Sequence, residues 1–264
     1  NSSGIGIRFE GCSYINLTGN NIFTNKGTSE GISAGQNATI LDNIIDSTGT
    51  GMLLSSGSFV RNNTIISDVY GMQGAGSGSV VEDMQINSTD LGIWLTGSYS
   101  NYTNMTIITT GDGSYGLYFS SGTVDSDNLF KNIKITTLGA SANPVYAAYY
   151  HNFSIVDSVL NSSAGASSLV LTSEGAELNS DTGLISMTNI TQLNGQAFTK
   201  TYDSNSTLNV YWYLDTNVTN STSQVEDTNV SLNNRLGSLL FSELSDASGL
   251  IARKTIQEYT RNTT

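Results

Sequence analysis

Cysteine, proline, histidine and charged residues are all scarce in this sequence. Its 264 residues include one cysteine, one proline and one histidine, and only 12% of them are charged. A lone cysteine excludes an intrachain disulfide and fits no metal-ligand spacing, so we expect Cys12 to be a small buried thiol, with an intermolecular disulfide as the alternative. The single proline, Pro144, excludes proline-rich linkers and collagen-like stalks. Because long helices normally carry charged outer faces, the low charge also argues against an α-helical protein.

Basic residues are especially few, which limits the expected partners. Ten Lys and Arg stand against 22 Asp and Glu, so the formal net charge is −12 at pH 7. Phosphate affinity depends on Lys and Arg displacing counterions, and we therefore expect neither nucleic acid nor an anionic membrane as partner. No apolar run approaches the roughly 18 residues of a membrane span. The first residues also lack the basic-then-apolar layout of a secretory signal, so we expect any export signal to have been removed or to lie outside this stretch.

What the sequence does contain is an internal repeat. A glycine followed by an apolar residue recurs at spacings of 20, 20, 21 and 24 residues, in Gly31-Ile32, Gly51-Met52, Gly71-Met72, Gly92-Ile93 and Gly116-Leu117. After each glycine an alternating pattern begins, which is typical of a short strand with one buried face.

A second marker keeps step with the glycines: Asn or Asp, then apolar residues, then a small polar residue. A period of 20 to 28 residues with short strands, little charge and no room for helices predicts a parallel β-solenoid, in which each turn of chain stacks on the next. One inward column is then formed by isoleucines, namely Ile65, Ile86, Ile107 and Ile135. A second column lies at a corner, where Asn side chains bond the turn backbone and each other, namely Asn43, Asn63, Asp83, Asn104 and Asn132.

These markers resemble those of the right-handed parallel β-helix repeat family, which includes surface and periplasmic proteins whose coils read Gly-Ile-x-Leu and Asn-x-x-Ile. The resemblance covers residues 1–200, about three quarters of the chain, and its closest local match is residues 12–25, CSYINLTGNNIFTN. Such a repeat is informative about fold and says little about activity. We predict an all-β protein whose residues 1–205 form a right-handed parallel β-helix of about eight coils.

The sequence pattern changes near Thr207. Residues 208–218 are rich in Val, Tyr, Trp and Leu without a coil marker, and further apolar pairs follow between turn clusters. This stretch is similar to the small immunoglobulin-like sandwich beside β-helices in archaeal surface proteins, and also to the carboxypeptidase-regulatory type. It departs from them at residues 223–228, SQVEDT, where a Gly-x-Pro-Val-x-Gly-Ala turn is usual, and it is shorter than the ~100 residues of a seven-stranded sandwich. We predict a small β-sandwich over residues 206–264, with an incomplete strand set as the alternative.

Asparagine also recurs in fifteen Asn-x-Ser/Thr sequons, about twice the seven that the Ser and Thr content would give by chance. Their acceptors are Asn1, Asn16, Asn37, Asn62, Asn87, Asn101, Asn104, Asn152, Asn161, Asn189, Asn205, Asn217, Asn220, Asn229 and Asn262. Because a sequon needs an export route and an exposed position, we interpret them as N-glycosylation sites of an extracellular or cell-surface protein. The alternative is that β-helix corners select Asn and Thr for structural reasons, although the last five acceptors lie outside the repeat.

The chain lacks the motifs of the pectin-type hydrolases that share the β-helix fold. Such enzymes pair carboxylates about 5 to 10 Å apart. Their Asn-Thr-Asp, Gly-His-Gly and Arg-Ile-Lys motifs have only remote counterparts at residues 88–90, 150–152 and 132–134, and the sequence has no Asp-Asp pair. It also shows no nucleophile triad, redox pair or phosphate-binding glycine loop. We therefore expect no catalytic residues, no metal and no cofactor.

Two clusters keep an enzymatic alternative open. A lyase needs a base near an acidic Ca²⁺-binding patch, and the candidates are Asp125 and Asp127 with Lys131 and Lys134, or a column of Asp42, Glu82 and Asp83. Solvated corner residues are the simpler interpretation of both. His151 stands among Tyr146, Tyr149 and Tyr150, whose rings could stack on a sugar. A single histidine without a placed acid is more often structural.

These observations favour a glycosylated structural subunit of an extracellular or cell-surface assembly, such as a sheath, surface layer or filament. A solenoid is stable only when its terminal coils are covered, whereas Ile5 and Ile7 stand in a coil-like stretch at the very start. Unpaired strand edges invite partner strands, so the expected partners are copies of the chain, together with covalent N-glycans. One alternative is a carbohydrate-binding adhesive module that uses residues 146–150 with Tyr99, Tyr102, Tyr115 and Tyr118. A polysaccharide lyase or hydrolase, or a piece of a longer chain, are further alternatives.

Overall fold

The computed structural model describes residues 4–9, 11–25, 29–74, 76–119, 127–148, 151–163, 165–172, 183–194, 199–202 and 206–262. All regular secondary structure in these residues is β-strand. The chain divides into two compact units, Asn1–Val210 with Thr260–Thr264, and Tyr211–Tyr259. The predicted boundary at residue 205 lies close to this division.

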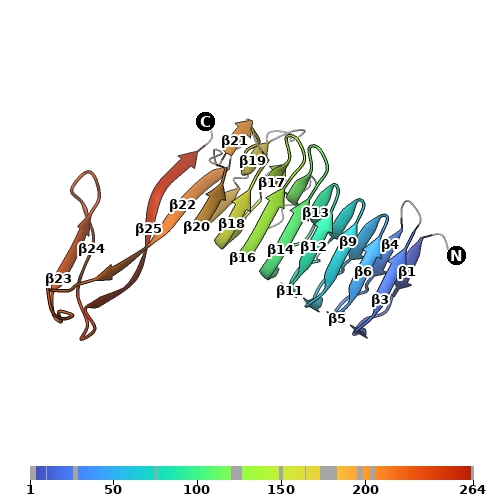
Figure 1. The fold of residues 1–264 in the computed structure, drawn as a ribbon, viewed down its shortest axis with the longest axis horizontal. Helices are drawn as coiled ribbons and strands as arrows, with labels where there is room; N and C mark the ends of the chain where they lie inside the picture. Colours follow the sequence, from blue (N-terminus) through green and yellow to red (C-terminus); the bar gives the residue numbers. More distant parts are fainter. Residues whose placement is uncertain are drawn as a thin grey trace. The chain divides into compact units, whose positions relative to one another are not determined.

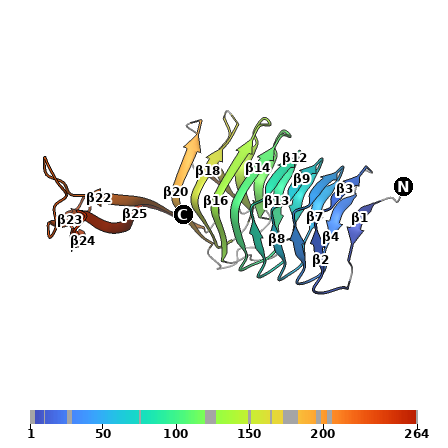
Figure 2. The ribbon, with the colours of Figure 1, turned by 60° about the horizontal axis from the view of Figure 1, so that its bottom comes forward.

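Two long sheets of stacked strands form the first unit (Figures 1 and 2). The nine-stranded sheet contains β1 (Ile5–Arg8), β4 (Glu30–Ser33), β7 (Thr50–Leu53), β10 (Tyr70–Gln73), β13 (Leu91–Leu95), β15 (Tyr115–Phe119), β17 (Asn143–Ala148), β19 (Leu169–Thr172) and β21 (Thr199–Tyr202). The fourteen-stranded sheet contains β2 (Asn16–Thr18), β3 (Asn21–Thr24), β5 (Thr39–Leu41), β6 (Ile44–Ser47), β8 (Phe59–Arg61), β9 (Thr64–Ser67), β11 (Val80–Glu82), β12 (Gln85–Ser88), β14 (Asn101–Thr109), β16 (Asn128–Thr137), β18 (Phe153–Asn161), β20 (Leu184–Leu193), β22 (Thr207–Asn217) and β25 (Leu250–Asn262).

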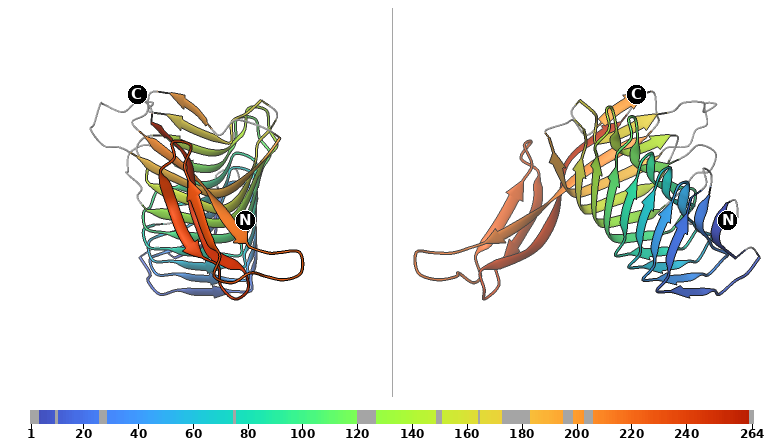
Figure 3. Two further views of the ribbon diagram at one scale, coloured as in Figure 1. Left: turned by 90° about the vertical axis from the view of Figure 1, so that its left-hand side faces the viewer. Right: turned by 45° about the vertical axis from the view of Figure 1, so that its right-hand side comes forward.

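Successive coils supply one strand to the nine-stranded sheet and one or two to the other, and neighbouring coils pair in parallel (Figure 3). In the early coils a short corner separates two strands such as β8 and β9, whereas from β14 onward the corner lies inside one longer strand. The predicted fold class, an all-β parallel β-solenoid, is confirmed.

The predicted isoleucine column is also confirmed. Strand register places Ile65, Ile86, Ile107 and Ile135 directly above one another, and all four side chains are fully buried. Complete burial of such a side chain stabilises a fold by about 1.5 to 3 kcal/mol. Repetition in every coil therefore makes this column a major part of the core.

The recurring glycines face this column from the nine-stranded sheet. A Cβ atom at Gly71 would overlap the Cγ2 atom of Ile86 and the carbonyl oxygen of Gly92, and a Cβ at Gly92 would overlap Ile107 in the same way. The two sheets thus approach too closely there for any side chain. Because each repeat glycine must face an isoleucine that belongs to the Asn marker, the two markers recur with nearly the same spacing along the sequence.

The predicted corner column is wrong in part, because its members occupy two adjacent columns. The inner column begins with buried amides: Asn63 Oδ1 accepts hydrogen bonds from the backbone N–H and the Nδ2 of Asn43, both at 2.9 Å. Asn43 Oδ1 accepts the equivalent pair from Asn20, at 2.9 and 3.0 Å. In the next coils Met84 and Met105 take this inner position, and the amide ladder ends.

The outer corner column contains residues with left-handed backbone. Their φ values lie between 51° and 58°, and they are Asp42, Asn62, Asp83, Asn104, Asn132, Asp157 and Asn189. Asn and Asp tolerate this conformation better than other residues with a side chain. The Nδ2 groups of Asn62, Asn104 and Asn189 each donate to the carboxylate of the Asp one coil earlier, at 2.7 to 3.0 Å.

Cys12 is exposed, so the expectation of a buried thiol is wrong. The residue lies in the connection between β1 and β2, in which none of the described residues is buried. A free thiol in this position is accessible to solvent.

The second unit contains the end of β22, most of β25, and the strands β23 (Asn229–Asn233) and β24 (Leu239–Leu244). β23 and β24 form a two-stranded antiparallel sheet. β22 pairs with β25, and contacts from Trp212 to Glu258 and from Asp215 to Arg253 show that these strands run in opposite directions. Between residues 211 and 259 only Ser245, Gly249 and Ile251 are buried. The immunoglobulin-like sandwich stays a prediction.

Candidate functional site

The residues predicted as modification sites lie at the surface wherever their side chains are described. Nine sequon acceptors are exposed: Asn16, Asn37, Asn62, Asn87, Asn101, Asn104, Asn217, Asn220 and Asn229. Three are half-buried: Asn152, Asn161 and Asn189. Asn1 and Asn205 lie outside the described residues, as does the side chain of Asn262. All twelve described acceptors are thus in reach of solvent.

Burial separates these acceptors from the structural asparagines. Asn43, Asn63 and Asn128 are each only 1% exposed, and none of them begins a sequon. Asn128 Nδ2 donates to the carbonyl oxygen of Gly97 at 2.8 Å, so it supports a turn as Asn43 and Asn63 do. Asn62 and Asn104 are compatible with either interpretation, because each is exposed and also donates a hydrogen bond within the outer corner column.

The sequons are distributed unevenly over the solenoid. Within the ranges of the nine-stranded sheet no asparagine begins a sequon, whereas the described acceptors of the first unit lie in the fourteen-stranded sheet or in the connections between strands. The acceptors of the first unit that lie within the strands of the fourteen-stranded sheet are Asn16, Asn87, Asn101, Asn104, Asn161, Asn189 and Asn262. One face of the solenoid would therefore stay free of its own glycans.

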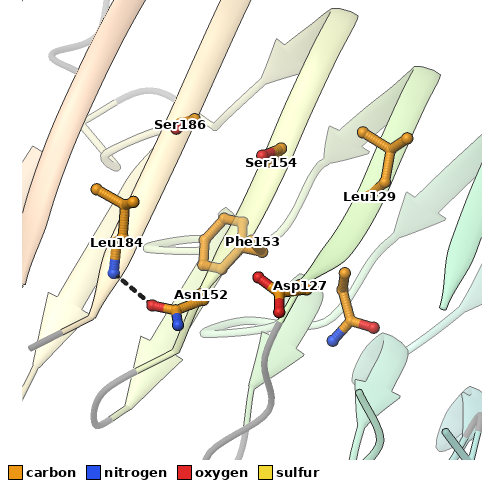
Figure 4. A pocket seen from close by; sticks show the side chains of 8 residues that line it. Asp127, Leu129, Asn152, Phe153, Ser154, Leu184 and Ser186 are labelled. Atoms are coloured by element: carbon orange, nitrogen blue, oxygen red, sulfur yellow. Dashed lines mark hydrogen bonds between the residues drawn. The ribbon is translucent and has the colours of Figure 1, made fainter. Parts of the chain in front are cut away.

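The lyase candidates do not gather in one site. Asp127 lines a hollow of about 220 Å³ on the fourteen-stranded sheet (Figure 4), in which the backbone N–H of Leu184 donates to Asn152 Oδ1 at 2.7 Å. The other lining residues are Asn128, Leu129, Phe153, Ser154 and Ser186. Neither Lys131 nor Lys134 lines the hollow, and Asp125 lies outside the described residues. Its described lining thus provides one carboxylate and no lysine, arginine or histidine.

The acidic column of the sequence interpretation is also divided. Asp42 and Asp83 share the outer corner column, with Asn62 between them, whereas Glu82 lies one position away, level with Arg61. In the part of the chain that the structure describes, no three His, Cys, Asp or Glu side chains are grouped so that they could hold a metal ion.

His151 is fully buried in the solenoid core. Its Nε2 atom lies within hydrogen-bond distance of the Ala148 carbonyl oxygen, and its ring centroid is 5.3 Å from that of Phe119. Burial lowers the pKa of His151 to about 4, against a smaller opposite effect of the Ala148 hydrogen bond. The neighbouring Tyr149 and Tyr150 lie outside the described residues.

The tyrosines proposed for sugar binding have different surroundings. Tyr102 is fully buried and stacks on Phe130 with ring centroids 4.6 Å apart, whereas Tyr99 is 64% exposed in a turn. Neither belongs to a common surface with Tyr115, Tyr118 and Tyr146.

Those three tyrosines share the outer face of the nine-stranded sheet with Tyr70 and Trp94, which sequence reasoning missed. Strand register aligns Trp94, Tyr118 and Tyr146. The sequence did contain a signal for this alignment: Trp94 and Tyr118 each follow a repeat glycine by two residues and therefore occupy the same position in successive coils. These five residues are called the aromatic ladder below.

No helix among the described residues is long and apolar enough to cross a membrane. No known family model matches the chain, and no curated protein is significantly similar to it. A solved structure of QnrB1, a plasmid-mediated fluoroquinolone resistance protein, aligns with 72% of this chain and 92% of its own at 8% identity, with a TM-score of 0.17. A superposition as loose as this supports no inference about function.

Proposed function

We propose that the chain is a glycosylated structural subunit of an extracellular or cell-surface assembly, and that copies associate through the free edge of β24. The observation that carries this proposal is the exposure of apolar side chains on that strand. Leu239, Leu240 and Leu244 are 61%, 48% and 60% exposed. Clustered exposed leucines are uncommon on monomeric soluble proteins and mark interaction surfaces.

The backbone of β24 supports the same proposal. Among the described residues β24 pairs only with β23, so the opposite edge of β24 presents unpaired N–H and C=O groups. Such an edge is a template for a strand from another chain. A second β24, added at this edge, would pair the backbone and bring its leucines against those of the first copy.

The solenoid is suited to a load-bearing role. Each coil is held by parallel pairing, by the isoleucine column and by the corner hydrogen bonds, and consecutive coils repeat at ~4.8 Å. The surface position of the described sequon acceptors supports a location in which N-glycans are added. Glycans on the fourteen-stranded sheet would keep that face from packing against protein.

Association is tested by light scattering and electron microscopy of the purified chain. The Leu240→Lys, Leu244→Lys double variant places charge on the edge and is expected to reduce the mass to that of one chain. The Ser231→Lys, Asn233→Lys double variant is the matched control, because it adds the same two charges on β23 at other exposed positions. A wild-type chain that stays monomeric at every concentration, or a double variant that assembles like wild type, contradicts the proposal.

Glycosylation is tested separately by mass spectrometry of the protein from its native host. We expect glycans on several of the nine exposed acceptors. Enzymatic glycan removal that leaves every sequon asparagine unchanged in mass would show an unmodified protein and contradict this part of the proposal.

A further inference from the structure

The outer face of the nine-stranded sheet differs from the rest of the solenoid in two ways. Its strands contain no sequon acceptor, and they carry the aromatic ladder. The five ladder side chains are half-buried, so part of each ring reaches solvent. A face without its own glycans is accessible to a large partner.

The ladder is ordered by ring contacts between successive coils. Tyr118 and Tyr146 stack with centroids 5.4 Å apart and planes 16° apart, and Tyr115 lies 4.5 Å from Tyr146. Trp94 meets Tyr118 at 6.2 Å and Tyr70 at 5.2 Å, both edge to face. Offset and edge-to-face arrangements of this kind are favourable, so neighbouring rings hold each other in position.

In the register of the sheet, the ring of Tyr146 is followed in the next coil by an aliphatic side chain. Strand register places Val170 directly beyond Tyr146. A hollow of about 240 Å³ lies at this end of the ladder, and its lining includes Tyr115, Tyr146 and Val170. The hollow therefore stands beside the last ring of the stack.

The other described lining residues are uncharged: Ser141, Asn143 and Ser167, with Gly165 and Ala166. Asn143 connects the two turns of this rim, since its Oδ1 accepts from the Ser167 N–H at 3.1 Å and its Nδ2 donates to the Ser141 carbonyl oxygen at 2.9 Å. Among the described residues the Ser141 and Ser167 hydroxyls make no hydrogen bond. These hydroxyls can therefore form hydrogen bonds with a ligand, and the hydrogen bonds of Asn143 hold the rim in position.

We propose that this hollow binds one neutral pyranose unit of a polysaccharide, with the sugar ring stacked on Tyr146. The negatively charged face of an aromatic ring attracts the polarised C–H groups of a sugar face. The Ser141 and Ser167 hydroxyls bond the hydroxyl groups at the edge of the sugar. The described lining carries no charge, which favours a neutral sugar over an acidic one, and the volume suits a single ring better than a larger ligand.

This inference is independent of association through β24, and its test uses saturation-transfer NMR on the whole chain. The probes are methyl β-glucopyranoside and methyl β-galactopyranoside, with indole as an aromatic competitor. We expect saturation of the ring protons of at least one glycoside, with millimolar affinity. Light scattering on the same samples reports association separately.

Two variants and one control locate the binding. Tyr146→Ala removes the stacking ring, and Val170→Phe fills the hollow with another ring; each is expected to weaken binding at least tenfold. Tyr99→Asn removes an exposed tyrosine outside the ladder, in a left-handed position that Asn tolerates, and should bind like wild type.

Three outcomes would overturn the proposal. The first is that neither glycoside receives saturation from the wild-type chain. The second is that binding persists in both Tyr146→Ala and Val170→Phe. The third is that indole binds at the hollow while the glycosides do not, which would assign the hollow to a planar aromatic ligand. Circular dichroism of each variant confirms its fold, and the two variants in the hollow make opposite changes in side-chain volume.

Discussion

Removal of the Asn63 side chain should destabilise the solenoid far more than removal of its sequence neighbour. Asn63 Oδ1 accepts two hydrogen bonds from Asn43, and its Nδ2 donates to the carbonyl oxygens of Ile40 and Arg61 at 3.0 and 2.9 Å. At about 1 kcal/mol for each net hydrogen bond, Asn63→Ala loses about 4 kcal/mol. The buried backbone N–H of Asn43 is left without its acceptor, which adds to this loss, whereas the Asn43 Nδ2 still donates to two backbone carbonyl oxygens.

The control is Asn62→Gly, one residue earlier. Asn62 makes one exposed hydrogen bond, to Asp42 at 2.7 Å, and glycine accepts its left-handed backbone. The expected loss is below about 1 kcal/mol. Asn63→Met adds a second comparison, since Met84 occupies this column naturally in the next coil; it keeps the volume but not the hydrogen bonds, and should resemble Asn63→Ala.

The free energies of unfolding are measured by urea denaturation followed by circular dichroism, on protein made without glycans so that loss of the Asn62 sequon has no effect. If Asn63→Ala costs no more than Asn62→Gly, the buried amide ladder does not hold this corner. If Asn63→Met is as stable as wild type, the volume of the side chain and not its hydrogen bonds determines the stability of this corner, which refutes the prediction.

Three further predictions concern the core and the free thiol. Gly92→Ala should lower the free energy of unfolding by about 2 to 3 kcal/mol, since its Cβ would overlap Ile107 and the next backbone; an unchanged urea midpoint would disprove the close approach. Between pH 6.5 and about 4 the unfolded chain binds a proton at His151 that the folded chain does not, so stability should fall by up to about 3 kcal/mol over that interval, with no contribution from this group above it. Thermal unfolding of His151→Gln should lack this part of the pH dependence, and an unaltered slope would show that the buried ring is not responsible. Cys12 should react with a thiol reagent as fast in the native as in the denatured chain, and strong native protection would contradict its exposure.

The repeat in the sequence was sufficient to predict the fold class and the isoleucine column. Ile65, Ile86 and Ile107 recur at 21-residue spacings because every coil needs a large apolar side chain opposite the repeat glycine. The steric requirement acts on residue type directly, so it leaves a pattern that can be read without coordinates.

The corner columns could not be separated in this way. Asn63 is selected for a buried amide that bridges coils, whereas Asn62 is selected for a left-handed backbone, and both requirements produce the same residue type. Only strand register shows that Asp83 lies level with Asn62 and that Met84 replaces Asn63. The sequence therefore indicated a corner rich in asparagine but not which asparagine points inward.

The aromatic ladder likewise depends on tertiary structure. Trp94, Tyr118 and Tyr146 are separated by 24 and 28 residues, and they meet only because each coil returns the chain to the same face. The sequence by itself determined that the chain winds into coils, since apolar periodicity follows from burial alone. Which side chains become neighbours, and which face is left without sequons, was decided by the length of each coil, because one residue more or less moves a side chain to another column or to the opposite face.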